Sequence, residues 1–373
     1  MFKRIVEIKK IIQKNKVLII YGPRQVGKTT LVMDYLSNYK GEYIYKTGDD
    51  IPFSNLISQC SLKILQDNIP EKILLVIDEA HKIENIGRAL KLVVDNIKDV
   101  GVIVTGSSSF DLMNQTGESL TGRKMVETLY PISILESLQK YKRIDLSSKV
   151  KDYMIYGMYP SVLNANTNEE RGEIVTEIAS SYLLKDILEF DKIKSSKTIL
   201  DLLKLIAFQI GRQVSTTELA STLGIDKNTV ARYLDLLEKS FVIYSLRGFS
   251  RNLRKEINKM QKYYFYDLGI RNAIINNFNQ FDSRNDIGEL WENFLISERV
   301  KRNAYKKISV SYYFWRTYDQ KEIDLIEEMN GELLAYEFKI NSKQASAPKD
   351  FTDNYKNSKF KVVSTDNYFE FLT

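Results

Sequence analysis

Unbroken runs of apolar residues, rather than alternating ones, mark the first third of the chain. They are rich in valine, isoleucine and leucine and occupy residues 17–21, 73–77 and 102–104. Such short runs are typical of strands that are buried on both faces of a parallel sheet. Segments with helical spacing accompany them, at residues 3–14, 31–36 and 61–68. This order predicts an α/β fold with a doubly wound parallel sheet for the first part of the chain.

The pattern changes further along the chain. Residues 146–195 have helical spacing, which fits either a lid over a ligand or plain helical packing. From about residue 284 an amphipathic helix is followed by three strand-like runs, at residues 310–316, 322–326 and 333–339. We therefore expect a helical middle segment and an α+β domain at the end of the chain.

The first apolar run leads into a glycine-rich stretch with the spacing G-x-x-x-x-G-K-[ST], between a predicted strand and a predicted helix. Glycines let backbone amides approach the phosphates of a nucleotide, and the helix presents its positive end to them. We expect the ammonium of Lys28 to reach the β- and γ-phosphates and the hydroxyl of Thr29 to bind Mg²⁺. The other residues of this predicted ATP-binding loop are Gly22, Pro23, Arg24, Gln25, Val26, Gly27 and Thr30.

Two acidic residues, Asp78 and Glu79, end the second apolar run. Open α/β sheets bind ligands at the carboxyl ends of their strands. We expect Asp78 to hold Mg²⁺, directly or through water, and Glu79 to polarise the attacking water as a catalytic residue. The alternative is an acidic cap on the next helix, but the glycine-rich loop upstream favours the catalytic interpretation.

Small polar residues end the third apolar run. Ser107 is a candidate contact of the nucleotide, with Thr105 and Ser108 beside it, and helix-capping serines are the alternative. Arg123 is a candidate for stabilising charge during phosphoryl transfer, and an ordinary surface arginine is the alternative. The sequence leaves open whether Arg123 acts on the nucleotide of its own chain or on that of a neighbouring copy.

Several stretches resemble one protein family. GPRQVGKTT, VIDEAHKI, VTGSSSF and ESLTGRKMVETLYPIS are similar to the AAA-type ATPase module of a prokaryotic family in which a C-terminal domain of unknown function follows. GMYPSVL, YLLKDILEF and GELWENFLISERV resemble later landmarks of that family, so the resemblance covers the whole chain. It implies a P-loop AAA-type sheet that binds ATP.

Residues 198–247 have helix–turn–helix spacing. A capped helix at 215–223 stops at Gly224, a second helix begins after Asp226, and the runs at 241–246 and 262–266 supply the two strands of a wing. If this winged helix contacts DNA, the groove-facing residues are Lys227, Asn228 and Arg232. Basic residues in the predicted wing turn favour DNA contact: Arg247, Arg251, Arg254 and Lys255. Many such modules only join proteins, so a protein partner is the alternative.

The spacing of Asp324, Glu337 and Lys339, with Glu292 on a preceding helix, resembles the PD-(D/E)XK nuclease core of restriction-endonuclease-like folds. Residues two apart on a strand face the same side, so Glu337 and Lys339 are expected to point together at Asp324. Glu292, Asp324 and Glu337 would then hold Mg²⁺, and Lys339 would steady the hydroxide or the phosphate. A salt bridge between strands without any catalysis is the alternative.

Composition narrows the chemistry. A single histidine (His81) and a single cysteine (Cys60) exclude a disulfide within the chain, thiolate clusters and histidine-based zinc sites. Any metal is then held by carboxylates, which favours Mg²⁺ or Mn²⁺. The net charge of +6 permits a polyanionic partner without requiring one. No apolar run reaches the ~18 residues of a membrane span, and the first residues do not form a signal peptide, so we expect a cytoplasmic protein without a membrane partner.

These patterns predict four domains: a P-loop AAA-type ATPase (1–145), a helical lid or linker (146–197), a winged helix (198–272) and a PD-(D/E)XK nuclease-like domain (273–373). The leading hypothesis is an Mg²⁺-dependent ATPase that couples ATP binding or hydrolysis to a nucleic-acid-related role of the later domains. The second is a metal-dependent nuclease gated by nucleotide. The third is a nucleotide switch that binds a protein partner, and each is compatible with a homo-oligomer.

Overall fold

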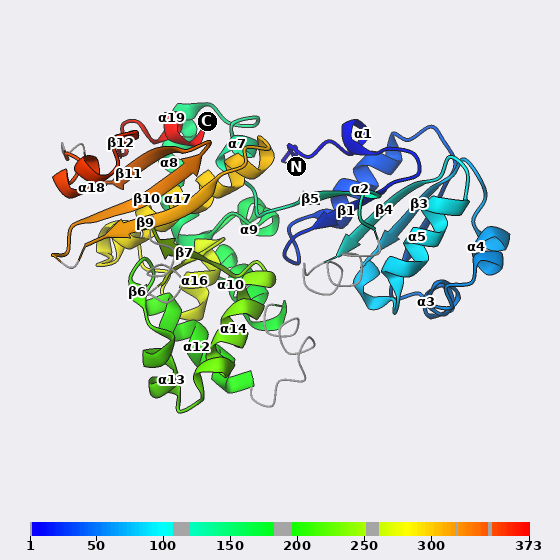
Figure 1. Ribbon diagram of the computed structural model, residues 1–373, viewed down its shortest axis with the longest axis horizontal. Coiled ribbons are helices and arrows are strands. Elements are labelled where there is room, and N and C mark those ends of the chain that lie inside the picture. The colour runs from blue at the N-terminus through cyan, green and yellow to red at the C-terminus, as the bar shows by residue number, and fades with distance from the viewer. Residues whose placement is uncertain (1, 107–119, 183–195, 251–260, 318, 342–344) are drawn as a thin grey trace. The chain divides into compact units, whose positions relative to one another are not determined.

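The chain forms two compact units in the computed structural model, which describes residues 2–106, 120–182, 196–250, 261–317, 319–341 and 345–373 (Figure 1). The smaller unit comprises Arg4–Tyr130 together with Lys239–Phe241, and the larger unit comprises the remaining described residues. No described helix is both long enough and apolar enough to cross a membrane.

A five-stranded sheet with the order β2-β3-β4-β1-β5 forms the centre of the smaller unit. All of its strand pairs are parallel. The strands are β1 (Val17–Tyr21), β2 (Tyr43–Thr47), β3 (Leu74–Asp78), β4 (Gly101–Gly106) and β5 (Lys124–Thr128). The three unbroken apolar runs are therefore confirmed as strands of a parallel sheet, and they are its three inner strands.

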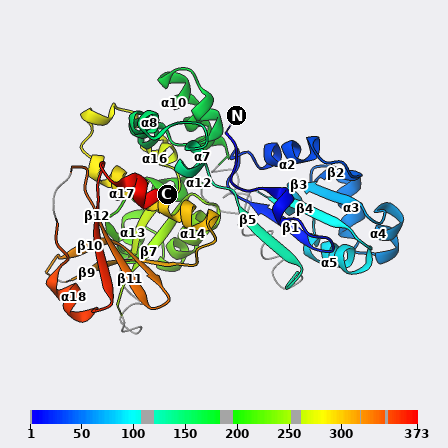
Figure 2. The ribbon, with the colours of Figure 1, turned by 90° about the horizontal axis from the view of Figure 1, so that it is seen from above.

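Helices cover both faces of this sheet. Residues 17, 19 and 21 of β1 share a core cluster with Ala89, Leu90 and Val93 of α5 (Ile86–Asn96). Residues 18 and 20 are also fully buried and point to the opposite face, and Figure 2 shows α2 (Lys28–Ser37) and α5 on opposite sides of the strands. The predicted doubly wound arrangement is present. The other helices are α1 (Ile8–Ile11), α3 (Ile51–Ser58), α4 (Leu62–Asn68) and the 3-10 turn η1 (Ala80–Lys82).

The expected helix at residues 3–14 is much shorter than the apolar spacing indicated. Only Ile8–Ile11 are helical, and Ile12 is extended with φ −61° and ψ 135°. Phe2 and Val6 are buried although neither lies in this helix, as is Ile8 at its first position. Burial requirements rather than helix propensity decide the conformation of this short segment.

The larger unit begins with a group of helices. They are α7 (Ile134–Ser137), α8 (Arg143–Tyr156), α9 (Pro160–Asn164), α10 (Asn168–Glu177), the π-helical turn η2 (Ile178–Tyr182), α12 (Ser196–Phe208), α13 (Thr216–Leu223) and α14 (Lys227–Lys239). The hydroxyl of Ser215 accepts a hydrogen bond from the amide of Thr217 and caps α13, which ends at Gly224 with a φ of 66°. The turn between α13 and α14 lies where the sequence predicts it.

A mixed seven-stranded sheet follows, in the order β12-β11-β10-β9-β7-β8-β6. Its strands are β6 (Gln213–Val214), β7 (Ile243–Gly248), β8 (Gln261–Phe265), β9 (Ser311–Arg316), β10 (Glu322–Met329), β11 (Glu332–Phe338) and β12 (Ser358–Val363). The remaining helices are α16 (Leu268–Ile274), η3 (Phe281–Ser283), α17 (Ile287–Tyr305), α18 (Lys349–Asn354) and α19 (Tyr368–Leu372).

The two predicted wing strands, β7 and β8, pair in antiparallel register, but they are also part of the larger sheet. Arg247 and Gly248 of β7 pair in parallel with Tyr313 and Phe314 of β9. Sequence patterns describe each segment separately and contain no sign of this continuity. The nuclease-like fold of residues 273–373 and the four domain boundaries stay predictions, whereas the continuous sheet is an observed feature.

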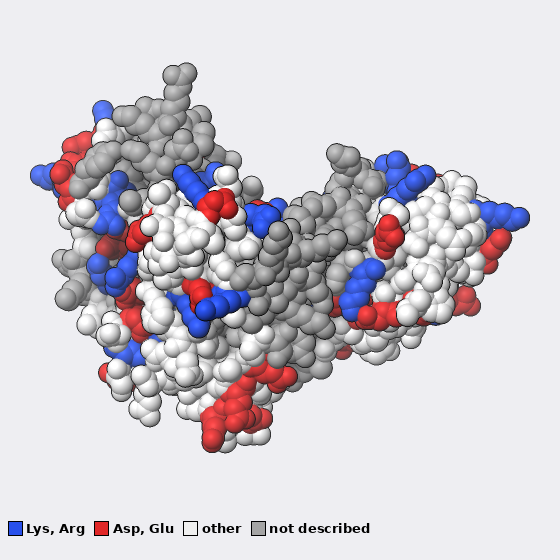
Figure 3. Space-filling model, turned by 90° about the horizontal axis from the view of Figure 1, so that it is seen from below, with Lys and Arg blue, Asp and Glu red and all other residues white. Residues whose placement is uncertain are grey.

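Charged side chains of both signs are interspersed over the described surface of the larger unit on the face seen in Figure 3. Exposed ion pairs of the larger unit include Lys321 with Asp350 and Lys359 with Glu332. Exposed pairs of this kind contribute little to stability. The lysine and arginine side chains therefore do not form a single basic patch on the described part of this face.

Candidate nucleotide-binding site

The glycine-rich loop leaves the sheet at the carboxyl end of β1, between β4 and β5. Gly22 has a φ of 147°, and a Cβ at this position would lie 2.0 Å from the carbonyl oxygen of Leu129. Gly27 precedes α2 in a left-handed conformation, with φ 92° and ψ 29°, that favours glycine. Backbone geometry therefore favours the two motif glycines at the two ends of the loop.

Lys28 begins α2 and is held over the loop. The residue is only 5% exposed, and its Nζ donates hydrogen bonds of 2.9 Å to the carbonyl oxygens of Gly22 and Pro23. The ammonium thus lies at the positive end of a ten-residue helix. A buried cation, a helix N-terminus and a glycine-rich backbone are together the electrostatic setting for binding phosphate.

Asp78, at the end of β3, connects the loop to the rest of the sheet edge. Its Oδ2 accepts a hydrogen bond of 2.8 Å from the hydroxyl of Thr29 and one of 3.1 Å from the phenol of Tyr45. Its Oδ1 accepts a hydrogen bond from the hydroxyl of Thr105 on β4. Residues from α2, β2, β3 and β4 therefore meet at one buried carboxylate.

Glu79 follows in a backbone conformation that is unusual for this residue type. Its φ is 51° and its ψ is 40°, and its amide donates a hydrogen bond of 3.1 Å to the hydroxyl of Thr105. Its Oε2 lies 3.5 Å from Nδ1 of His81. Non-glycine residues in this region of the backbone cluster at functional sites, and Glu79 directly follows Asp78 at the carboxyl edge of the sheet.

Tyr45 and Thr105 hold the acidic pair, although no motif points to Tyr45 and the sequence assigned Thr105 to the nucleotide. Burial, together with the neighbouring Asp78 charge, raises the pKa of Tyr45 to about 12, so this phenol stays a donor. Thr105 is completely buried and uses its hydroxyl both to donate to Asp78 and to accept from Glu79. Only the packing of β2 and β4 beside β3 reveals these two positioning residues.

The oxygen atoms of Thr29 and Asp78 fit a hard divalent cation. The Thr29 hydroxyl and Oδ2 of Asp78 lie 2.8 Å apart. Magnesium in nucleotide sites is bound by one or two protein oxygens of this kind together with phosphates and water. These two residues would therefore hold Mg²⁺ alongside a bound triphosphate.

The remaining loop residues differ in exposure. Val26 is fully buried, Arg24 is half-buried, and Gln25 and Thr30 are exposed. Gln25 has a φ of 61°, which turns the loop backbone before Gly27. Ser107 and Ser108 lie outside the described residues, so their predicted contacts with the nucleotide stay predictions.

Arg123 lies at the opposite edge of the sheet from the loop. It precedes Lys124, which pairs with Val17 at the start of β1, and its Nε is 2.5 Å from Oδ1 of Asp95 at the end of α5. At about 3.3 Å per residue, the length of β1 places the backbone of Arg123 roughly 13–17 Å from the loop. The structure therefore does not bring Arg123 to the nucleotide site of its own chain, because it forms an ion pair at the amino ends of the strands. A contact with another copy of the chain stays a prediction.

The four predicted nuclease residues come from neighbouring elements of the larger unit. Glu292 lies on α17, Asp324 on β10 and Glu337 on β11, with Lys339 directly after β11. Oδ2 of Asp324 accepts a hydrogen bond of 2.7 Å from the amide of Phe338, and Oε1 of Glu337 is 2.6 Å from Nζ of Lys339. Glu337 and Lys339 therefore point the same way, as an ion pair.

These carboxylates do not form a metal cage. Oε1 of Glu292 accepts hydrogen bonds of 3.2 Å from Nζ of Lys262 and 2.5 Å from the phenol of Tyr264. In the described ranges, no group of three or more histidine, cysteine, aspartate or glutamate side chains is arranged to hold a metal ion. One oxygen of each predicted metal ligand contacts a protein donor in this arrangement, and the metal site expected at Glu292, Asp324 and Glu337 stays a prediction. Burial, and then the charges of Glu292 and Glu337, raise the pKa of Asp324 well above its ordinary range.

The three residues proposed to face DNA lie at the start of α14. Lys227, Asn228 and Arg232 are all exposed, and the guanidinium of Arg232 lies 5.5 Å from the ring centre of Tyr233. The buried side of the same helix carries Val230 and Leu234. Arg251, Arg254 and Lys255 of the predicted wing turn lie outside the described residues.

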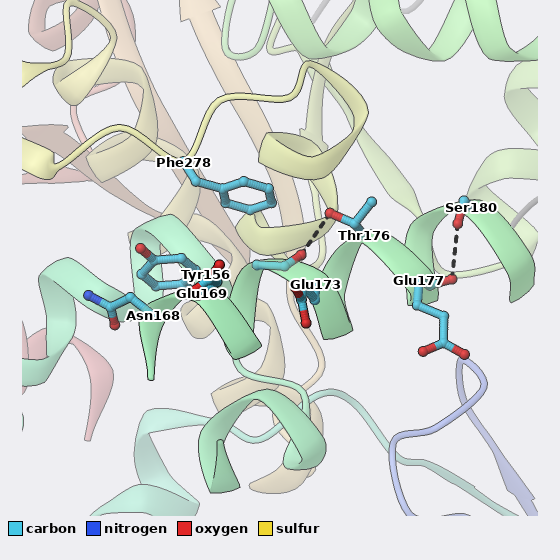
Figure 4. A pocket seen from close by; sticks show the side chains of 9 residues that line it. Tyr156, Asn168, Glu169, Glu173, Thr176, Glu177, Ser180 and Phe278 are labelled. Carbon is cyan, nitrogen blue, oxygen red and sulfur yellow. Dashed lines mark hydrogen bonds between the residues drawn. The ribbon is translucent and has the colours of Figure 1, made fainter. Parts of the chain in front are cut away.

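A separate groove runs along α10 in the larger unit (Figure 4). It has a volume of about 660 Å³, and its walls include Glu169, Glu173 and Glu177 together with the parallel rings of Tyr156 and Phe278. Three carboxylates at four-residue spacing on one helix face repel a triphosphate. The charge of this groove therefore does not suit a nucleotide.

Three family models match consecutive parts of the chain. Residues 14–138 match a family described as an AAA domain, and residues 147–280 and 287–371 match two domains of unknown function, DUF8612 and DUF4143. The resemblance found in the sequence is confirmed: an AAA domain is followed by C-terminal domains of unknown function.

Relatives that match most of this chain occur in bacteria and archaea. An uncharacterized protein of Haemophilus influenzae is 26% identical over 384 residues, which cover 94% of this chain and 89% of the relative. Uncharacterized proteins of Mycobacterium tuberculosis and Methanocaldococcus jannaschii are 25% and 24% identical, over 90% and 91% of this chain and 73% and 78% of their own.

Solved structures with partial likeness are more distant. The Thermotoga maritima RuvB Holliday junction branch migration motor is 17% identical with a TM-score of 0.31, covering 61% of this chain and 81% of that chain. A chain from the structure of Drosophila ORC bound to AT-rich DNA and Cdc6 is 9% identical with a TM-score of 0.25, covering 70% and 86%. Likeness at this level indicates neither a shared partner nor a shared activity.

Proposed function

We propose that this chain, an AAA domain followed by two domains of unknown function, binds ATP with Mg²⁺ and hydrolyses it. The observation that carries the proposal is the 2.8 Å hydrogen bond from Thr29 to Asp78. It joins the helix after the glycine-rich loop to the acidic end of β3, so that phosphate donors and metal-binding oxygens lie at one sheet edge.

Each residue has a distinct role in this proposal. The loop amides and Lys28 bind the phosphates, and Thr29 and Asp78 hold Mg²⁺, which neutralises charge on the transferring phosphoryl group. Glu79 accepts the proton of the attacking water or orients it. Thr105 and Tyr45 keep the Asp78 carboxylate in place through their hydroxyl groups.

Nucleotide binding and turnover separate these roles. Lys28→Ala should abolish detectable binding of a fluorescent ATP analogue, because the phosphates lose their buried cation. Lys63→Ala is the matched control, since Lys63 is an exposed lysine on α4 of the same unit. Equal binding by Lys28→Ala and wild type would refute the proposal.

Glu79→Gln should bind the analogue normally and lose about 10²–10⁴-fold in turnover, the usual contribution of a positioned general base. Glu84→Gln, an exposed neighbour, should keep wild-type turnover. Normal turnover in Glu79→Gln would remove Glu79 from the mechanism while leaving nucleotide binding untouched.

A role of the later domains with nucleic acid is the second part of the proposal. The exposed Lys227, Asn228 and Arg232 at the start of α14 support it, since basic and amide side chains there are suited to phosphate and base contacts. Binding of a labelled duplex should weaken with salt, and Arg232→Ala should weaken it further. Lys204→Ala, an exposed lysine on α12, is the control. Absence of binding at low salt would favour a protein partner instead.

A further inference from the structure

A buried lysine lies among the carboxylates that the sequence assigns to a metal. Lys262 comes from β8, and its side chain is 2% exposed. Its Nζ lies 3.2 Å from Oε1 of Glu292 on α17 and also pairs with Glu322 on β10. Asp324 lies two residues after Glu322 on the same strand, and its charge acts on Lys262 as well. Two carboxylates from two elements thus pair with one buried ammonium.

The surroundings of Lys262 hold it in this position. Its Nζ lies 5.5 Å from the ring centre of Phe314 on β9, and Tyr264, two residues along the same strand, donates to the same oxygen of Glu292. Burying an ammonium is costly unless it is paired and hydrogen-bonded. The ion pairs with Glu292 and Glu322 and the aromatic face of Phe314 meet that requirement, so the lysine does not need to leave the cluster.

The other carboxylate of the predicted metal site is paired too. Glu337 pairs with Lys339 at 2.6 Å, and Nη1 of Arg316 lies 3.4 Å from Oε2 of Glu322. A divalent ion needs several oxygen ligands at about 2.0–2.6 Å. An ion bound through Oε1 of Glu292 would compete with the Lys262 ammonium for that oxygen, and an ion bound at either oxygen of this carboxylate would be repelled by the nearby ammonium.

We propose that Lys262 is the permanent cation of this cluster and takes the place of a divalent metal. The wild-type chain then holds no metal at Glu292, Asp324 and Glu337, and these residues do not cleave nucleic acid. This inference is independent of the ATP site, which lies in the smaller unit. It makes a gain of metal binding the expected result of removing one lysine.

Manganese binding in the absence of nucleotide tests the proposal. The loss of the free Mn²⁺ signal in electron paramagnetic resonance is measured for wild type, Lys262→Met, Lys262→Arg and the double variant Lys262→Met with Asp324→Asn. Lys262→Met should bind one Mn²⁺ per chain more than wild type, and its melting temperature should rise with Mn²⁺. The double variant should lose both gains, and Lys262→Arg, which keeps the cation, should behave as wild type.

Wild type and Asp324→Asn provide a second arm that does not depend on the folding of Lys262→Met. Equal Mn²⁺ binding by these two proteins supports the proposal, as does refolding of Lys262→Met only in the presence of Mn²⁺. Mn²⁺ binding by wild type that Asp324→Asn abolishes would overturn it. A Lys262→Met variant that folds but binds no more Mn²⁺ than wild type would also overturn the proposal.

Discussion

Gly22 shows how a single position constrains the nucleotide loop. Its positive φ and the 2.0 Å approach of a Cβ to the Leu129 carbonyl both exclude a side chain. Gly22→Ala should destabilise the smaller unit by at least about 1–3 kcal/mol from backbone strain alone, with the clash in addition. Chemical denaturation followed by circular dichroism measures this change.

Gly288→Ala is the comparison for that variant, because nothing lies within 4 Å of its Cβ position. It lies in the first turn of α17, where alanine is at least as favourable as glycine. Unchanged stability of Gly22→Ala would contradict the close approach to Leu129.

Thr105 is another position that the fold constrains. Its single hydroxyl forms hydrogen bonds with two partners. Thr105→Val keeps the shape but leaves the Asp78 carboxylate and the Glu79 amide without this hydroxyl. We expect a loss of about 1–3 kcal/mol of stability from the buried groups, and lower ATP turnover because the acidic pair is no longer held. Steady-state hydrolysis and thermal melting measure the two effects.

Thr176→Val controls for the loss of a threonine hydroxyl. The Thr176 hydroxyl is exposed and donates only to the Gly172 carbonyl of its own helix. This variant should leave turnover unchanged, and wild-type turnover in Thr105→Val would show that Asp78 and Glu79 do not need Thr105.

At the scale of elements, the start of α17 is held by an ion-pair cluster. Asp286 accepts from Nε of Arg284 at 2.8 Å and from Nη1 of Arg271 on α16 at 2.5 Å. Both arginine side chains are almost completely buried. Asp286→Ala should cost about 3–5 kcal/mol, since it leaves two buried guanidinium groups without their shared carboxylate.

The same cluster predicts a pH dependence. Burial raises the pKa of Asp286, but the hydrogen bonds from Arg284 and Arg271 outweigh it, so the folded pKa lies below the unfolded value of 3.8. The stabilisation is therefore present above pH 3.8 and is lost as the pH falls through the folded pKa. Unfolding curves from pH 6 down to about pH 2 should show this loss in wild type and not in Asp286→Ala.

Asp282→Ala is the matched control for the cluster. Asp282 is 81% exposed and pairs only with Lys151 in solvent, so its removal should change stability by less than about 1 kcal/mol. Equal effects of Asp282→Ala and Asp286→Ala would contradict a special role of the buried cluster.

At the scale of the whole molecule, the two units predict a localised response to nucleotide. An ATP analogue with Mg²⁺ at about 100 times its Kd should stabilise the protein by about 2.7 kcal/mol through mass action. The contacts proposed for it all lie within Arg4–Tyr130. Hydrogen exchange should therefore slow first in β1, β3 and α2.

Lys28→Ala should show no change in exchange on addition of the analogue and Mg²⁺. Protection that appears in the larger unit alone would contradict the assignment of the nucleotide to the glycine-rich loop. Protection in both units would show instead that nucleotide binding in the smaller unit also slows exchange in the larger unit. Such coupling is the behaviour expected of a nucleotide switch.

Sequence alone determined the features that depend on local pattern. The unbroken apolar runs predicted the inner strands β1, β3 and β4 because a strand buried on both faces needs apolar residues at every position. Local motifs predicted the glycine-rich loop, the two acids at the end of β3, and the helix pair α13 and α14. In each motif the defining residues are neighbours along the chain. The strands β9, β10 and β11 also lie where the three strand-like runs predicted them.

Tertiary structure decided everything that depends on which strands become neighbours. It placed Tyr45 and Thr105 against Asp78, put Arg123 at the far edge of the sheet beside Asp95, and joined the wing strand β7 to β9. It also brought Lys262 to Glu292, thirty residues away along the chain. No periodicity encodes such contacts, because the free energy that selects them comes from burial and pairing across the sheet rather than from residues adjacent in sequence.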